Sequence, residues 1–154
     1  LHNLVNQEIL DGRFSYLQRA IGLADSESSP FYDRSHMAGS IYSSSRSEKA
    51  VQVQTLHEEE LVKKLEPPYD LIKCDIEGSE WEFLNHYQNL IKESKYLLLE
   101  WHSWHEGGDG LPQIENLTHS LDFRTVRSSK PIPAVGREGE VGLILLKNQF
   151  HDCS

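Results

Sequence analysis

The sequence has few cysteines, a single methionine and no long apolar run, and each scarcity narrows what the protein can be. Its two cysteines, Cys74 and Cys153, are too few for a disulfide scaffold, so the composition favours a reducing compartment such as the cytoplasm. No stretch approaches the roughly 18 apolar residues that a membrane helix needs. The mean hydropathy is −0.53, and together these features exclude a membrane span.

Basic residues are also scarce. Lysine and arginine number 15 against 24 aspartates and glutamates, which gives a net charge of −9 over 154 residues. Nucleic acid and anionic membrane surfaces require a basic footprint, so neither is expected as the main partner. A hydrophobic content of 38% is too high for a disordered acidic segment. The length fits a single domain, over residues 1–150, followed by a short tail over 151–154.

Apolar periodicity predicts an alternation of strands and helices along most of the chain. Period-two or continuous apolar runs predict strands at 14–21, 31–32, 51–53, 69–76, 96–101, 123–126 and 141–146. Helical spacing predicts helices at 1–12, 56–65, 79–91 and 112–121, with a turn at 24–30 and a polar loop at 35–47. Such an alternation indicates an α/β protein with a largely parallel sheet, and the last two strands suggest an antiparallel pair.

One helix start has a recognisable capping signature. Ser79 and Glu82 stand three residues apart, in the spacing of a capping box, in which each side chain bonds the backbone N–H of the other residue. The helix is therefore predicted to begin at Ser79.

Polar side chains gather where two neighbouring predicted strands end. The first strand ends in Lys73-Cys74-Asp75-Ile76-Glu77-Gly78-Ser79-Glu80, and the second in Glu100-Trp101-His102-Ser103-Trp104-His105. Ligands of open α/β sheets bind at the carboxyl ends of strands, so both segments are candidate site segments. Strand alternation places Lys73 and Asp75 on one face and Cys74 on the other. Gly78 permits either a positive φ or a close backbone approach at the turn.

Each of these residues also has a structural interpretation. Asp75 suits a cap at a strand end, and Glu77 and Glu80 suit a solvated first helical turn. Glu100 ends an apolar run, where burial without a partner is costly, and this favours a function. His102 and His105 fit surface or stacking roles better than metal ligation. Cys74 is interpreted as a small buried hydrophobe, and Lys73 as the partner of a carboxylate.

The run Asp70-Leu71-Ile72-Lys73-Cys74-Asp75-Ile76-Glu77-Gly78-Ser79-Glu80, followed by Leu84, resembles the signature of the FkbM-type methyltransferase family, D-x-I-K-x-D-x-E-G-x-E-x-x-x-L. Flanking segments support it: Val51-Gln52-Val53-Gln54-Thr55-Leu56 resembles the strand before the family's "T-L-D", and Leu97-Leu98-Leu99-Glu100-Trp101-His102 resembles the next strand. His57 stands where the family usually has aspartate. The resemblance covers most of residues 1–148.

The resemblance implies a Rossmann-like class I methyltransferase sheet, mostly parallel with an antiparallel strand near the C-terminus. It implies transfer of a methyl group from S-adenosyl-L-methionine to a hydroxyl of a sugar or small natural product. The residues at the two strand ends are then interpreted as catalytic (Asp75, Glu100 and His102) and cofactor-binding (Asp75, Glu77 and Gly78). No metal ligand is assigned, although in a related methyltransferase class a divalent ion lies at these strand ends, with Asp75 and Glu100 or His102 as the corresponding pair.

One departure concerns the cofactor loop. Such enzymes hold the cofactor with a glycine-rich loop after the first strand, whereas Gly107-Gly108-Asp109-Gly110 follows the family's fifth strand. The chain also opens on Leu1, with Met37 as its single methionine. We therefore expect two strands and the main cofactor loop to lie upstream of Leu1.

Two other classes stay open at this point. One is a non-catalytic interaction module with a methyltransferase-like fold. The other is a divalent-metal hydrolase whose ligands come from Asp75, Glu77, Glu80, Glu100, His102 and His105, although no compact ligand spacing supports it. The sequence assigns neither the acceptor nor the oligomeric state.

Overall fold

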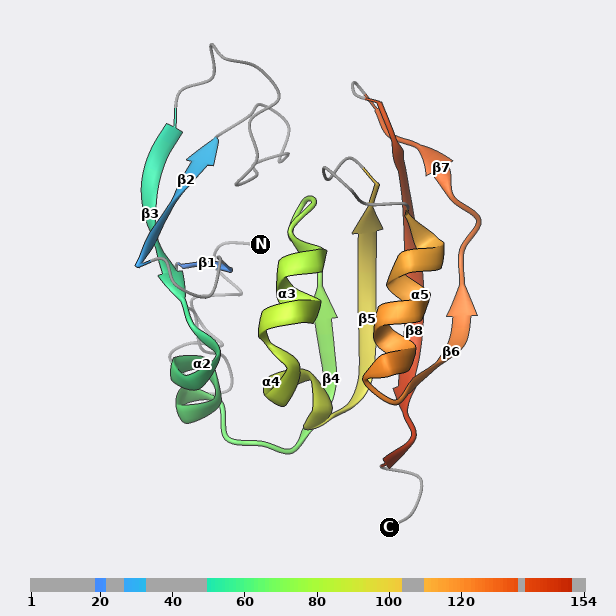
Figure 1. Cartoon of the computed structure of the whole chain (residues 1–154), viewed down its shortest axis with the longest axis horizontal. Coiled ribbons are helices and arrows are strands. Elements are labelled where there is room, and N and C mark those ends of the chain that lie inside the picture. Colours follow the sequence, from blue (N-terminus) through green and yellow to red (C-terminus); the bar gives the residue numbers. More distant parts are fainter. Residues whose placement is uncertain (1–18, 22–26, 33–49, 104–109, 136–137, 151–154) are drawn as a thin grey trace, which may run out of the picture.

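The computed structural model describes residues 19–21, 27–32, 50–103, 110–135 and 138–150, which form two sheets with helices packed against them (Figure 1). The smaller sheet contains β1 (Ala20–Ile21), β2 (Ser28–Tyr32) and β3 (Ala50–Leu56). The larger contains β4 (Tyr69–Cys74), β5 (Ser94–His102), β6 (Phe123–Ser128), β7 (Ile132–Pro133) and β8 (Glu140–Asn148). The described helices are α2 (Glu58–Lys64), α3 (Glu80–His86), α4 (Gln88–Lys92) and α5 (Leu111–Ser120).

The prediction of a mostly parallel, Rossmann-like sheet is wrong. The larger sheet has the order β4-β5-β8-β6, with β7 on β8, and its one parallel pairing is that of β4 with β5. The strand β8 runs antiparallel between β5 and β6 and pairs with both, so α5 joins two strands that are not neighbours. A strand–helix rhythm predicts parallel neighbours only when each helix connects adjacent strands. The protein is therefore α/β with mixed sheets.

The N-terminal part differs from the prediction in a second way. The turn expected over 24–30 overlaps β2, which pairs antiparallel with β3 from Ser28 to Tyr32. Pro30 is tolerated within this strand because β2 lies at the edge of its sheet, where a missing N–H breaks no ladder on the outer side. The helix expected over 1–12 and the loop over 35–47 lie outside the described residues, as does most of the strand expected over 14–21.

The core lies between one face of the larger sheet and the helices α3, α4 and α5, which cover that face (Figure 1). Alternation along β5 buries Leu97, Leu99 and Trp101 almost completely, while Leu98 and Glu100 are half-buried on the other face. On α5, Ile114 is buried and Leu117 packs on its edge, as the helical spacing predicts. This packing fixes the position of the end of β5 relative to the helices. It therefore also fixes the position of the residues that follow Trp101.

Three buried or half-buried polar contacts tie the layers together. The Asn148 side chain, fully buried at the end of β8, donates to the backbone carbonyls of Lys92 and Ser94 at 2.8 and 3.0 Å. Glu58 of α2 accepts the backbone N–H of Leu90 at 2.8 Å, which satisfies a donor in the first turn of α4. The Tyr87 hydroxyl donates to the carbonyl of Leu56 at the end of β3. Through these contacts, the two sheets and the helices form one packed unit.

The pairing of Gly142 with Trp101 gives a test of this packing. A Cβ on Gly142 would lie 2.8 Å from Cζ2 of Trp101, closer than real Cβ atoms approach a ring carbon. The ring has no room to move because it is 1% exposed. We therefore expect Gly142→Ala to lower the free energy of unfolding by about 1–3 kcal/mol, measured by urea denaturation.

Glu140→Ala is the matched control for Gly142→Ala, because residue 140 lies on the same strand with its side chain exposed. Its effect is expected to stay within about 0.5 kcal/mol. Equal stability of the Gly142→Ala chain and the unchanged chain would contradict the packing described.

Candidate functional site

The turn between β4 and α3 wraps around the side chain of Glu80. Glu77 and Gly78 both have left-handed backbone, with φ of 53° and 103°. This brings the backbone N–H groups of Gly78 and Ile76 to Oε1 of Glu80, at 3.1 and 3.3 Å. Of the two roles that the sequence allowed for Gly78, the structure shows the positive φ, and the glycine suits it because it has no Cβ to clash.

The predicted capping box is absent. Ser79 precedes α3, but its side chain makes no capping hydrogen bond. The helix begins at Glu80, and the carboxylate of that residue satisfies backbone donors of the preceding turn instead. The cause is the left-handed pair before Ser79, which turns the N–H groups of 76 and 78 toward Glu80.

The strand β5 delivers His102 to the same point. Since β4 and β5 are parallel neighbours, their carboxyl ends lie side by side. There Nδ1 of His102 donates to Oε1 of Glu80 over 2.9 Å, and the two side chains are 2% and 0% exposed. A buried carboxylate and a buried imidazole therefore hold each other in one orientation.

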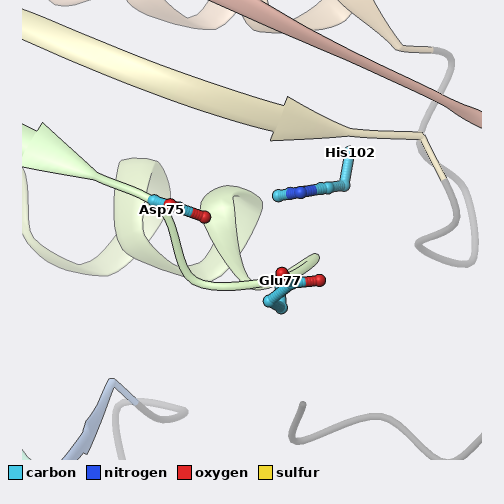
Figure 2. Close-up of side chains that lie close together, drawn as sticks. All are labelled: Asp75, Glu77 and His102. Atoms are coloured by element: carbon cyan, nitrogen blue, oxygen red, sulfur yellow. The ribbon is translucent and has the colours of Figure 1, made fainter. Parts of the chain in front are cut away.

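Three ligand-type side chains converge beside this pair. One atom each of Asp75, Glu77 and His102 lies within 4.8 Å of the other two. Figure 2 shows the His102 ring pointing from the end of β5 toward the turn that carries the two carboxylates. Asp75 is exposed, Glu77 half-buried and His102 buried, so the cluster joins the interior to the surface. Of the six residues considered as hydrolase ligands, the structure brings these three together with Glu80.

The remaining predicted residues lie around the cluster. Nζ of Lys73 pairs with Oδ2 of Asp75 at 3.0 Å, on the face that strand alternation predicts, and this pairing raises the pKa of Lys73. Glu100 is half-buried on β5, and its charge acts on both Lys73 and His102, but it is outside the group within 4.8 Å. Trp104 and His105 lie outside the described residues.

The charges around His102 decide the direction in which its pKa is shifted. Burial by itself disfavours the imidazolium form. The hydrogen bond to Glu80 and the negative charges of Glu80, Glu77 and Glu100 outweigh this effect, so the pKa of His102 lies above its ordinary value. The imidazole is therefore a stronger base than a free histidine.

Cys74 takes no part in this chemistry. Its side chain is buried on the core face of β4. Burial, followed by the negative charges of Glu80 and Asp75, raises the pKa of the thiol well above its ordinary value. A thiol that stays protonated is a poor nucleophile, so Cys74 acts as the small buried hydrophobe that the sequence indicates.

A family model described as the methyltransferase FkbM domain matches residues 3–125, which include the smaller sheet, β4, β5, the start of β6 and the whole cluster. The chain belongs to the FkbM methyltransferase domain family. The resemblance read from the β4–α3 segment is thus confirmed, and the cluster lies within the matched region of this FkbM domain. No curated protein and no solved structure matches the chain significantly.

The sequence predicted no membrane-spanning segment, and the helices of the FkbM domain can be compared with that prediction. Among the described helices, none has the length and apolar character needed to cross a membrane.

Glu80 is the residue of the FkbM domain whose role the sequence did not reveal. From the sequence, Glu80 is interpreted either as a solvated residue of a first helical turn or as one of several hydrolase ligands. In the structure it is fully buried and contacts His102, 22 residues further along the chain. The available signal was the E-G-x-E spacing at 77–80, but periodicity alone places residue 80 on no particular side of the helix.

The pairing of His102 with Glu80 predicts an effect on titration. Glu80→Gln removes the negative charge and keeps a side-chain oxygen that can accept the N–H of Gly78. We expect the pKa of His102 to fall, because the contact that raises it most has lost its charge. The measurement is an NMR titration of the His102 ring in the presence of a chelator. Glu59→Gln, on the exposed face of α2, is the control and should leave the value unchanged.

The same contact predicts a direction for stability against pH. A group whose pKa is higher in the folded state stabilises that state fully below the unfolded pKa. This contribution is lost as the pH rises through the folded pKa. For His102 it is therefore complete below its ordinary value of 6.5 and declines as the pH rises through the raised value. Glu80→Gln should make this decline shallower in urea denaturation, and an unchanged slope would contradict the assignment.

Proposed function

We propose that the FkbM domain transfers a methyl group from S-adenosyl-L-methionine to a hydroxyl of a sugar or small natural product. The observation that carries the proposal is the convergence of Asp75, Glu77 and His102 at the carboxyl ends of β4 and β5, within a methyltransferase domain. Two carboxylates and a basic imidazole are the groups that a cationic donor and a hydroxyl acceptor require.

The carboxylates of the turn suit the cofactor. Bound S-adenosyl-L-methionine would supply an electrophilic methyl group on a positively charged sulfur. Asp75 and Glu77 would face this charge and accept hydrogen bonds from the amine or ribose hydroxyls of the molecule. The backbone of Gly78 holds the turn in place by donating to Glu80.

An apolar cavity beside the turn supports the same assignment. Its volume is about 320 Å³, and its lining includes Ile21, Leu61, Leu65, Ile72, Cys74 and Ile76. Cys74 and Ile76 belong to the motif segment, so one wall of the cavity continues into the carboxylate turn. An apolar space next to hydrogen-bonding groups is the usual composition of a small-molecule pocket, and it suits a flat heterocycle such as adenine.

The hydroxyl proton would leave toward the end of β5. Methyl transfer forms a carbon–oxygen bond as the carbon–sulfur bond breaks, and the acceptor must lose its proton to a base. Glu100 and His102, which both lie on β5, would be the proton acceptors. The ring of His102 is held in one orientation by Glu80, which limits the entropy lost when an acceptor binds beside it.

The charge of the site also restricts the acceptor. Asp75, Glu77, Glu80 and Glu100 surround His102, and Lys73 already pairs with Asp75. A neutral hydroxyl can approach such a surface at little electrostatic cost, whereas a phosphate or carboxylate would be repelled. The proposed acceptor is therefore an uncharged alcohol on a sugar or small molecule.

Asp75→Asn tests the proposal in the full natural protein that contains these residues. The substitution removes a charge but little volume, and Asp75 is exposed, so the fold should survive. We expect methyl transfer from labelled S-adenosyl-L-methionine to fall by about 100-fold or more. Asp70→Asn, exposed on the same strand, is the matched control and should keep its activity. Turnover of the Asp75→Asn protein equal to that of the unchanged protein would refute the role of Asp75.

Calorimetry separates this function from that of a non-catalytic module. The unchanged full protein should bind S-adenosyl-L-methionine with measurable heat and a rise in melting temperature. Absence of both would favour an interaction module that has the fold of the family without its cofactor.

A further inference from the structure

We propose that Asp75, Glu77 and His102 form a binding site for a divalent metal ion of the Mn²⁺ type. The sequence assigned no metal to this chain, and a metal site at these three residues goes beyond the proposed methyl transfer. Ion binding can be measured without any methyl donor, so its failure and that of the proposed function are separate outcomes.

The three side chains are close enough to draw together around one ion. Around an octahedral ion with ligands at about 2.1 Å, neighbouring ligand atoms lie about 3.0 Å apart and opposite ones about 4.2 Å apart. One ligand-type atom of each side chain, for His102 one of its two ring nitrogens, already lies within 4.8 Å of the other two. Asp75 and Glu77 are on a turn and are partly exposed, so their carboxylates have room to rotate inward onto an ion.

Glu80 gives a second observation, independent of the three ligands. A ligating histidine usually donates its other ring N–H to a carboxylate, which fixes the tautomer and the ring orientation. His102 does this through Nδ1 to Oε1 of Glu80, so Nε2 is the nitrogen assigned to the ion. The other oxygen of Glu80, Oε2, is buried without a hydrogen-bond partner among the described residues. A water molecule held by an ion would supply the donor that this oxygen lacks.

The ligand types select the ion. Two carboxylates are hard oxygen ligands, which suit Mg²⁺ and Mn²⁺, whereas an imidazole favours a transition metal over Mg²⁺. Three protein ligands also leave positions open for water or a hydroxyl. Mn²⁺ satisfies both preferences and binds isolated surface histidines weakly, so it is the ion to use in the test.

A bound ion would give His102 and Glu100, the two site residues on β5, different roles. With His102 as an ion ligand, Glu100 is the remaining proton acceptor at this end of the sheet. A hydroxyl bound to the ion would lose its proton more readily, because the cation stabilises the alkoxide. Lys73 opposes the ion, since its ammonium pairs with Oδ2 of Asp75 and competes for that carboxylate.

The test is titration of tag-free, chelator-treated protein with MnCl₂, followed by calorimetry and by the EPR signal of free Mn²⁺. We expect one saturable site per chain. Asp75→Asn and Glu77→Gln should each weaken binding at least tenfold, and both residues are exposed enough for the variants to fold, as circular dichroism would verify. Asp70→Asn is the matched control and should bind like the unchanged protein.

Two further variants distinguish this site from diffuse binding to an acidic surface. Lys73→Gln should tighten Mn²⁺ binding several-fold, because it removes the competing cation. Pulsed EPR of bound Mn²⁺ should show coupling to an imidazole nitrogen, and His102→Gln should abolish it. Binding of equal strength in the unchanged, Asp75→Asn and Glu77→Gln proteins would overturn the proposal. So would a bound ion without nitrogen coupling.

Discussion

The contact between Glu80 and His102 is the interaction on which the site depends. Both side chains are almost wholly removed from water, and a charge in that position is tolerated only with a partner. Loss of one member of such a pair typically costs about 3–5 kcal/mol, because the other is left buried and uncompensated. The pair thus holds the end of β5 against the start of α3, and the geometry of the neighbouring groups follows from it.

The backbone of the β4–α3 turn is adapted to this constraint. A carboxylate at the first position of a helix would ordinarily face solvent. Here the left-handed conformations of Glu77 and Gly78 direct two backbone N–H groups at Glu80, so its charge is stabilised from both the turn and the imidazole. The same backbone path places Asp75 and Glu77 on the solvent side of the pair. A structural contact and a chemically useful cluster therefore share one turn.

The antiparallel strand β8 supports the site from the far side. It enters between β5 and β6 and pairs along β5 up to His102, so the strand that carries the imidazole is hydrogen-bonded on both edges. The ring of Trp101 packs against Gly142 of β8. This contact fixes the position and direction of His102, which follows Trp101. A parallel neighbour in this position would have met β5 with a different register. The antiparallel direction of β8 beside β6 agrees with the antiparallel pair that the last two predicted strands suggest.

The sequence predicted those features that depend on neighbours along the chain. Apolar alternation located β3, β4, β5 and β8 within a few residues, and the helical spacing of Ile114 and Leu117 located α5. The D-x-E-G-x-E run predicted the family and the turn, with a glycine that permits the positive φ found at Gly78. The polar residues at the two strand ends also predicted Asp75, Glu77 and His102 as site residues, a set that remains a proposal. These features are local because hydrogen bonding and side-chain direction within a strand, a turn or a helix repeat over a few residues.

Other features were decided only by the tertiary structure. The order β4-β5-β8-β6, the pairing of Pro30 within an edge strand and the burial of Glu80 all depend on segments distant in sequence. Ser79 illustrates the limit: its spacing to Glu82 fits a capping box, yet the turn before it gave the capping role to Glu80. Periodicity indicates which face of an element is apolar, but not which distant group will meet a buried charge. The desolvation of Glu80 and His102 is balanced by their contact with each other, and that balance exists only once the chain has folded.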